Sequence, residues 1–175
     1  MLDALALRMK RARRLLAEAA RLYDDPDLPL ERAARTTRDF ASGAEWMRLA
    51  LECLRGEPPQ GRGAFQALGL LKYGACALAF AACWRLAPLL APLAFYAVEA
   101  QMVFLFPLVL DGHPAPWRES LRLTRRAGGT LQVMRTVIRL AFTMLLGGFA
   151  DGRFVRAWCL GCLAVVLWYE EVRRA

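Results

Sequence analysis

"AFQALGLLKYGACALAFAACWRLAPLLAPLAFYAVEAQMVFLFPLVL", residues 64–110, is the stretch that decides the fold of this chain. Its charged residues are Lys72, Arg85 and Glu99. A helix that crosses a bilayer needs about 20 mostly apolar residues, so residues 64–84 and 88–110 are each long enough to span. The connection "CWRLAP" is very short. We therefore expect an antiparallel transmembrane hairpin, with prolines that bend or cap its second helix.

Two further apolar segments follow, at residues 131–150 and 154–170, and both are shorter in their purely apolar parts. They are expected to form a second hairpin that either spans the membrane or enters it only partly. The predicted fold class is therefore all-α, an integral membrane protein with two helical hairpins. The predicted membrane domain covers residues 64–171.

Composition and charge favour a membrane over nucleic acid. The 175 residues are 57% hydrophobic and carry a net charge of +8, with 24 basic side chains, almost all arginine. The basic residues flank the apolar segments, which is typical of topology signals and of contact with anionic lipid head groups. No nucleic-acid partner is expected. Four of the five cysteines lie in apolar segments, so they are interpreted as small hydrophobic side chains and not as a disulfide framework.

Residues 1–57 are predicted to form a cytoplasmic helical region. Apolar residues at alternating spacings of four and three indicate an amphipathic helix over 2–23: Leu5, Met9, Ala12, Leu16, Ala19 and Tyr23. This helix either lies on an anionic membrane surface or packs on a neighbouring helix or subunit. "SGAE" at 42–45 fits a capping box with Ser42 as the N-cap of a second helix, and Gly56 suits its C-terminal cap.

The distribution of basic residues predicts the orientation. With four spans and a cytoplasmic N-terminus, the arginine-rich N-terminal region, the loop after residue 110 and the C-terminal tail all lie on the cytoplasmic side. The expected location is a bacterial inner membrane that the chain crosses several times, with both termini in the cytoplasm.

Lys72 and Glu99 are the most informative polar residues inside the predicted spans. If the hairpin turns near Leu86, they lie 14 residues before and 13 residues after the turn. A rise of about 1.5 Å per residue puts both roughly 20 Å from it, at nearly the same depth. Because an unpaired charge at that depth is costly, we expect Glu99 to pair with Lys72 or with Arg139. The pair is either part of an ion or substrate path, or a structural link between helices or subunits.

The sequence contains no catalytic signature, so no catalytic residue is predicted and the chain is not expected to be an enzyme. It has no phosphate-binding loop, nucleophile elbow or dinucleotide fingerprint, and its only histidine excludes a site with several histidines. "CLGC" at 159–162 is a lone CxxC, whereas a structural zinc site needs four ligands. No metal site is expected, and no cofactor can be identified.

The segment after residue 110 is predicted to be a cytoplasmic interfacial loop. Its candidate residues are Asp111, His113, Trp117, Arg118, Arg122, Arg125 and Arg126. Pro116 is expected to start a short helix whose arginines share one face towards water and lipid phosphate. Thr124, with Trp117 and Leu121, would lie along the neighbouring face, against the acyl boundary.

Residues 106–126, "FPLVLDGHPAPWRESLRLTRR", also carry a resemblance. An apolar span that exits through a "P-L-x-L-x-D/E-G" pattern and continues into "W-x-x-S-x-x-L-T-R" resembles the membrane-domain family of glycerophosphodiester phosphodiesterases and their stand-alone multi-span relatives. The residues that match are Pro107, Leu108, Asp111, Gly112, Trp117, Ser120, Leu123, Thr124 and Arg125. The resemblance implies a topology, an apolar span followed by an amphipathic helix and the next span. It carries over no catalytic residue.

Three functional hypotheses follow. The first is a non-catalytic integral membrane subunit, an accessory, scaffold or transport-related component with other membrane subunits as partners. The second is a small membrane-embedded enzyme acting on lipid or isoprenoid substrates, which would need an acid or histidine cluster at the membrane face. The third is a soluble helical protein with a very apolar core.

Overall fold

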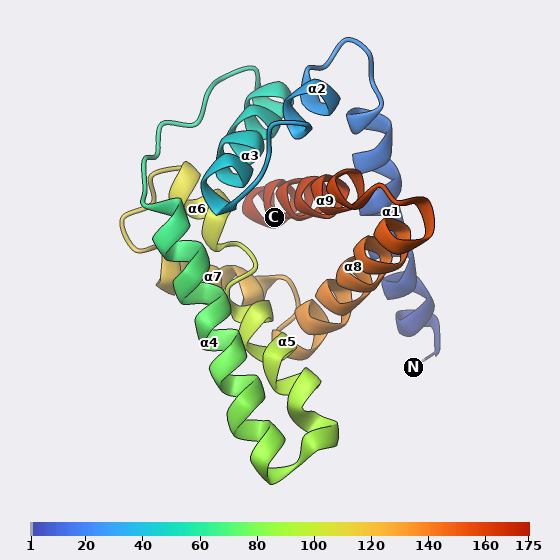
Figure 1. Cartoon of the computed structure of the whole chain (residues 1–175), viewed down its shortest axis with the longest axis vertical. Coiled ribbons are helices and arrows are strands. Elements are labelled where there is room, and N and C mark those ends of the chain that lie inside the picture. Colours follow the sequence, from blue (N-terminus) through green and yellow to red (C-terminus); the bar gives the residue numbers. More distant parts are fainter. Residues whose placement is uncertain (1) are drawn as a thin grey trace. The chain divides into compact units, whose positions relative to one another are not determined.

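The structure is a computed structural model that describes residues 2–175, with the backbone alone for residues 2–10, 150 and 151. The described chain is all-helical (Figure 1). Its elements are α1 (Leu2–Tyr23), α2 (Leu30–Ala34), α3 (Phe40–Arg55), α4 (Phe65–Leu86), the 3₁₀ turn η1 (Pro88–Leu90), α5 (Ala91–Gln101), α6 (Leu105–Leu110), α7 (Pro116–Arg126), α8 (Thr130–Asp151) and α9 (Phe154–Arg174). The predicted all-α class is therefore confirmed.

The chain divides into two compact units. The first contains Met1–Pro59 and Ile138–Ala175, and the second contains Gln60–Val137. Helix α8 belongs to both, because it begins in the second unit and continues into the first. The predicted membrane domain, residues 64–171, thus includes nearly all of the second unit. It also includes most of the C-terminal segment, Ile138–Ala175, of the first unit.

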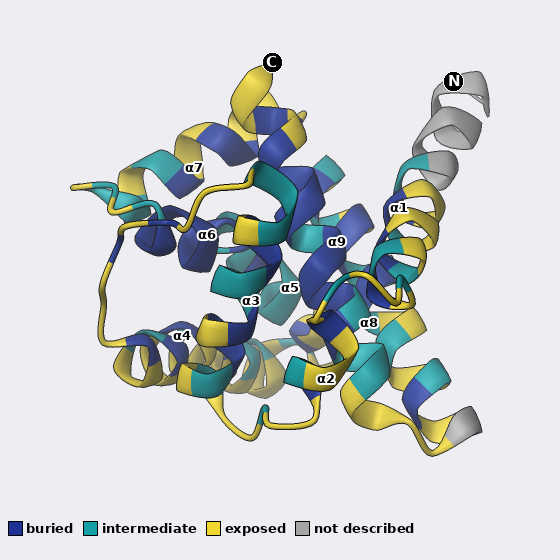
Figure 2. Ribbon diagram, turned by 90° about the horizontal axis from the view of Figure 1, so that it is seen from above, coloured by how far each residue is buried: buried dark blue, intermediate teal, exposed yellow. Residues whose placement is uncertain are grey.

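Helix α9 forms the centre of the first unit and packs against α1, α2 and α3. Most of it is dark blue in Figure 2, which marks buried residues. Trp168 is fully buried and Tyr169 is 2% exposed. The facing helices approach closely because small residues line them: a Cβ on Gly43 of α3 would lie 2.5 Å from the indole ring of Trp158. Helix α1 contributes buried Leu15 and Ala19, whereas the side chains of Leu5 and Met9 are outside the described set.

The N-cap predicted for the second helix, Ser42, is wrong by three residues. Helix α3 begins at Phe40, and its N-cap is Asp39, whose carboxylate accepts a hydrogen bond from the backbone N–H of Ser42 at 2.8 Å. The Ser42 hydroxyl in turn accepts from the Asp39 backbone N–H, so Ser42 is the third helical residue. These N–H and O–H donors lower the pKa of Asp39. The predicted C-terminal cap at Gly56 is confirmed by its left-handed conformation, with φ of 77°.

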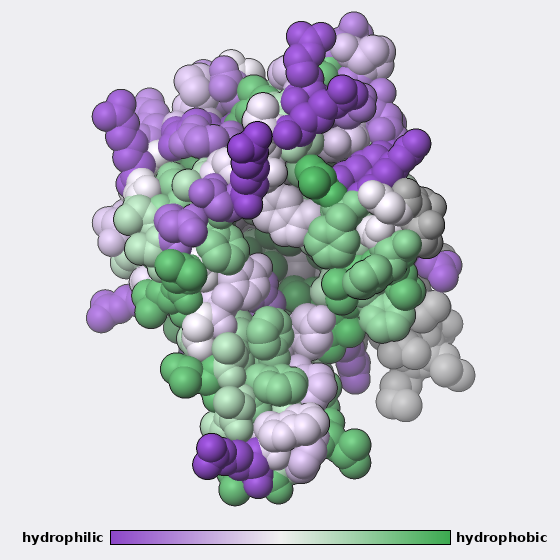
Figure 3. Space-filling model, viewed as in Figure 1, coloured by the Kyte–Doolittle hydropathy of each residue, from purple (hydrophilic) through white to green (hydrophobic). Residues whose placement is uncertain are grey.

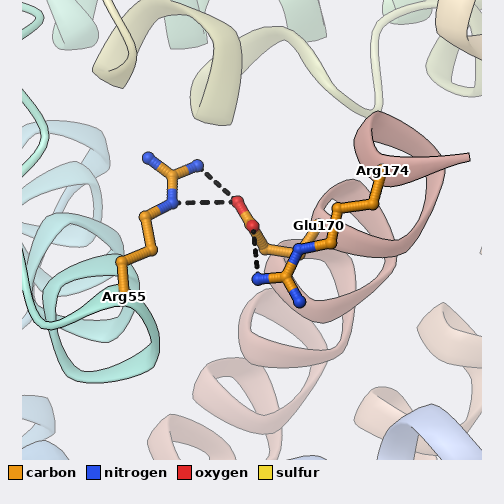
Figure 4. A network of polar contacts seen from close by, with 3 residues as sticks. All are labelled: Arg55, Glu170 and Arg174. Atoms are coloured by element: carbon orange, nitrogen blue, oxygen red, sulfur yellow. Dashed lines mark hydrogen bonds and ion pairs between the residues drawn. The ribbon is translucent and has the colours of Figure 1, made fainter.

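Glu170 of α9 joins the last turn of α3 to the C-terminal end of its own helix (Figure 4). One oxygen of Glu170 accepts hydrogen bonds from Nε of Arg55, at 3.0 Å, and from a terminal nitrogen of the same guanidinium. The other oxygen accepts from Arg174 at 3.2 Å. The side chains of Arg55 and Glu170 are only 18% and 12% exposed. A buried carboxylate thus holds α3 and α9 together through a two-bond arginine contact.

The second unit is built around an antiparallel pair, α4 and α5, which run side by side and are joined through η1 (Figure 1). Helices α6 and α7 pack on each other beside α5. The segment leading into α4 is fixed at Gly61, whose N–H donates to the carbonyl of Leu110 at 2.7 Å. Only glycine fits there, because a Cβ would lie 2.0 Å from the Val109 carbonyl oxygen.

Three segments of residues 2–175 are long and apolar enough, by length and composition, to cross a membrane: Phe65–Leu86, Pro88–Leu110 and Thr130–Phe149. They correspond closely to three of the four predicted spans. The second is not one continuous helix, because α5 ends at Gln101 and α6 begins at Leu105. The fourth predicted span, 154–170, is helical but not among the three. The second hairpin therefore stays a prediction.

Glu170 and its neighbour Glu171 provide a matched test of the first unit. Glu170→Gln removes the charge from a largely buried pair, so we expect a loss of roughly 3 kcal/mol in the free energy of unfolding. Glu171→Gln removes the partner of Arg14, and both of those side chains are exposed, at 39% and 57%. Its expected cost is below about 1 kcal/mol. Unfolding of the detergent-solubilised variants, followed by circular dichroism, measures both. Equal losses would contradict this account.

Candidate functional site: a buried ion pair in the helical hairpin

The inward face of α4 is narrow and includes a charged residue. Its buried residues are Phe65, Gly69, Lys72 and Cys76. These positions are separated by four, three and four residues, so they form one line along the helix. The rest of α4 turns outward, including large apolar side chains such as Leu78, which is 73% exposed. The distribution is the reverse of that in a water-soluble helix, where charged residues face outward.

Lys72 and Glu99 meet between α4 and α5. The Nζ atom of Lys72 lies 2.9 Å from one carboxylate oxygen of Glu99, and the two side chains are 5% and 11% exposed. The depth argument from the sequence placed these residues at the same level, and the structure brings them into direct contact. Because α4 and α5 run antiparallel, an equal distance from the turn is sufficient to align them.

The surroundings of the pair complete its interactions. The other Glu99 oxygen lies 3.7 Å from the Cys76 sulfur, whose thiol donates to it. The Lys72 ammonium lies 5.0 Å from the centroid of the Tyr73 ring and 5.6 Å from that of Phe106. Cations at such distances are attracted to aromatic faces. Both oxygens of the carboxylate are thus engaged, and the ammonium is enclosed by one carboxylate and two rings.

Lys72 and Glu99 thus form a buried ion pair with no net charge. Taking two charges out of water costs several kcal/mol each, and only close geometry with additional hydrogen bonds offsets this cost. Chemically, the same groups are those that exchange protons or cations in membrane-embedded paths. Within the described residues, no cluster of three or more histidine, cysteine or acidic side chains is placed to hold a metal ion.

Helix α5 ends at Gln101, two residues after Glu99, and Pro107 gives the physical reason. Proline lacks an N–H and its ring clashes with the carbonyl four residues earlier, here that of Val103. The chain between α5 and α6 therefore leaves the α-helical pattern, and Leu105 donates to the Met102 carbonyl at 3.1 Å. The N–H of Leu105, which in a continuous helix would donate to the Gln101 carbonyl, therefore donates elsewhere.

Two hydroxyl groups of α7 donate to carbonyls at the end of α5. The Ser120 hydroxyl donates to the carbonyl of Gln101 at 2.7 Å, and the Thr124 hydroxyl donates to that of Ala100 at 3.0 Å. Ser120 is 1% exposed and Thr124 is fully buried. Because the two residues are four positions apart, both hydroxyls face α5 from the same side of α7. The expectation that Thr124 lies against the acyl boundary is therefore wrong.

The other residues of the predicted interfacial loop are placed as follows. Arg118, Arg122, Arg125 and Arg126 are all exposed on α7, whereas Asp111, His113 and Trp117 are half-buried. Arg122 lies 3.6 Å from Glu119. Nδ1 of His113 accepts a hydrogen bond from the Ala115 backbone N–H at 3.2 Å, so the imidazole helps to close the turn before α7. The loop residues therefore follow the ion pair in the sequence but are not part of it.

Arg139, the third residue of the predicted polar set, belongs to the first unit through the second half of α8. Its carbonyl accepts from the Thr143 hydroxyl at 2.9 Å. The alternative pairing of Arg139 with Glu99, in place of Lys72, stays a prediction.

Sequence reasoning missed the role of Ser120 and Thr124, although both were visible as hydroxyl residues four positions apart on the less charged side of an arginine-rich helix. It also missed Glu170, whose partner Arg55 is 115 positions away. For Glu170, no local pattern identifies the partner. For the two hydroxyls, the predicted bend near Pro107 could have indicated a need for donors.

Comparisons with known proteins do not identify relatives: no family model, no curated protein and no solved structure matches the chain. The resemblance in residues 106–126 therefore stays a prediction.

A double-mutant cycle tests the ion pair. Glu99→Leu or Lys72→Met alone leaves one buried charge without its partner, so each should cost about 3–5 kcal/mol in unfolding free energy. The double variant Lys72→Met/Glu99→Leu has no buried charge and should recover most of the loss. Unfolding in detergent and the fraction of protein inserted in membranes are the readouts. Single variants that match the wild type in both would exclude the pairing.

The hydroxyl donors of α7 are tested by Thr124→Val. The change keeps the shape of the side chain and leaves the buried Ala100 carbonyl without its donor, which should cost about 1–3 kcal/mol. Thr143→Val is the control, because that exposed hydroxyl bonds only to a carbonyl of its own helix. Thermal unfolding should separate the two variants clearly, and similar melting temperatures would count against the donor role.

Proposed function

We propose that the chain is a non-catalytic integral membrane subunit, an accessory, scaffold or transport-related component of a bacterial inner-membrane assembly. One observation carries the membrane part of the proposal. The α4–α5 hairpin turns its large apolar side chains outward and the charged residues of its middle part, Lys72 and Glu99, inward. Leu71 and Leu78 on α4 are 59% and 73% exposed, whereas Lys72 is 4% exposed.

The hydropathy of the surface supports this reading. Green, apolar surface covers much of the α4–α5 hairpin in Figure 3. The largest exposed apolar side chains there are Leu70, Leu71, Leu78, Trp84, Leu86, Leu89 and Leu90. Soluble monomers rarely expose contiguous apolar patches beyond a few hundred Å². Contact of this apolar surface with lipid would carry no free-energy penalty, whereas its contact with water would.

The charged loop supports the proposed orientation. The exposed arginines of α7 follow directly after the segment that ends at Leu110, and the positive-inside rule favours the cytoplasm for such a short, basic connection. In this threading the α4–α5 turn with Arg85 lies on the opposite side. Placing both termini in the cytoplasm would require a second hairpin of α8 and α9, whereas α9 packs against α1, α2 and α3 and is not among the three segments long and apolar enough to span.

The role as a subunit, and not as an enzyme, rests on the character of the buried polar groups. Lys72, Glu99 and Cys76 saturate one another, and they lie between packed helices with aromatic rings beside them. Such a pair is suited to fixing the register of two helices. Partner subunits would cover the outward apolar faces that lipid does not. Native mass analysis after detergent extraction would identify them.

An arginine scan of outward leucines tests the membrane location. Leu78→Arg places a charge near the middle of α4 on a side chain that is 73% exposed. In a bilayer this costs about 2.5–3.5 kcal/mol, so the inserted fraction should fall strongly. Leu86→Arg is the control: it is 88% exposed but lies at the end of α4, where a charge reaches the interface.

In water, by contrast, both exposed leucines would tolerate arginine equally. Carbonate extraction of membranes that contain each variant measures insertion. Release of the wild type by carbonate without detergent would overturn the proposed location.

A further inference from the structure

A cleft lies within the first unit where α1, α8 and α9 meet. Its volume is about 200 Å³, and it is lined by Leu16, Met144, Gly147, Ala157 and Leu160, with Thr143 and two arginines at the edge. The Thr143 hydroxyl bonds to the carbonyl of Arg139, so it presents little free polarity to the cleft. The interior is therefore apolar.

Small residues leave the cleft unfilled. Gly147 has no side chain, and a Cβ built on it would lie 3.9 Å from the Cβ of Ala157. An apolar cavity of roughly 150 Å³ in a protein core stays dry and accepts an apolar molecule the size of benzene. A cleft of this size can therefore hold several methylene groups of an alkyl chain, and it is too small for a whole lipid.

Two arginines line the cleft, and one of them is paired with a carboxylate. Arg153 is exposed, and Arg156 is fixed by two hydrogen bonds from one guanidinium nitrogen to the carboxylate of Asp24, at 2.6 and 2.9 Å. The Arg156 guanidinium also lies 5.6 Å from the centroid of the Tyr23 ring. A guanidinium has five N–H donors, so these contacts leave others for a ligand.

The N-terminus of α9 adds to this charge. Arg153 is its N-cap, and among the described side chains none caps the helix. The first N–H groups of this helix of 21 residues place the positive end of the helix dipole at the turn that carries Arg153. Exposed Phe149 and Phe154 flank the same turn, with their rings 6.1 Å apart.

From this combination we propose that the cleft binds an amphiphile with one alkyl chain in the apolar interior and an anionic head group at Arg153 and Arg156. Basic pockets beside membrane helices are known to hold anionic lipid head groups. Two sources share this chemistry, an anionic phospholipid of the bilayer and a free fatty acid. The inference goes beyond the proposed function, because the cleft belongs to the first unit and not to the α4–α5 hairpin.

Binding is measured with decyl phosphate by calorimetry, on delipidated protein kept in solution by an amphipathic polymer. Decanol is the neutral counterpart. We expect decyl phosphate to bind about tenfold or more tightly than decanol, because one charge-assisted contact contributes about that factor. Equal binding of the two compounds, or no binding, would overturn the proposal.

Two variants locate the site. Arg153→Glu should remove the preference for the phosphate, and Ala157→Leu should fill the cleft and weaken both compounds. Arg38→Glu, an exposed arginine outside the cleft, is the matched control and should bind as the wild type does. Circular dichroism establishes that each variant is folded. Unchanged binding in both Arg153→Glu and Ala157→Leu would place the ligand elsewhere and contradict the proposal.

Native mass spectrometry then separates the two sources. Separate samples of the protein are exposed to phosphatidylglycerol and to decanoate. The compound that the protein retains, at one molecule per chain, identifies the natural class of ligand. Leu78→Arg separates failure of the cleft proposal from failure of the proposed function. This variant should impair membrane insertion and leave binding in the cleft unchanged.

Discussion

The contact between Lys72 and Glu99 determines which face of α4 turns inward. A leucine-rich helix with few charges offers many surfaces for packing, and its apolar residues alone do not choose among them. The ion pair does, because neither charge tolerates exposure to an apolar surround without its partner. Once the pair has formed, Gly69 and Cys76 must also face α5, and Leu71 and Leu78 must face outward. The outward apolar surface on which the proposed function rests is a consequence of that choice.

The first unit follows the opposite rule. Its central helix, α9, buries large apolar and aromatic side chains, and the charged residues of α9 lie near its two ends. Glu170, near the C-terminal end, is buried, and two arginines accompany it. The two units thus use ion pairs differently: in the second, the pair lies within an apolar helical hairpin, and in the first it connects helix ends at the edge of a core.

The sequence predicted the helices well because their signals are local. The bounds of α1, α4, α8 and the start of α9 agree with the predicted segments within a few residues, since apolar length and turn residues set them. The Lys72–Glu99 contact was also accessible, because a short antiparallel connection converts sequence distance into depth. What sequence could not supply were contacts between distant segments. Arg55 and Glu170 share no periodic pattern, and the burial of α9 depends on the close approach of Gly43 and Trp158. The start of α3 was misplaced because both Asp39 and Ser42 are good N-cap residues.

The hydroxyls of Ser120 and Thr124 have a consequence for the order of biosynthesis. When α5 has left the ribosome, the carbonyls of Ala100 and Gln101 lack these hydroxyl donors, because α7 has not yet been made. An unsatisfied carbonyl in an apolar surround costs several kcal/mol, so the interrupted helix is incomplete until about 20 more residues have followed. The α4–α5 hairpin and α7 therefore form one folding step. A chain truncated before Ser120 would contain every apolar residue of the hairpin and still lack the groups that complete it.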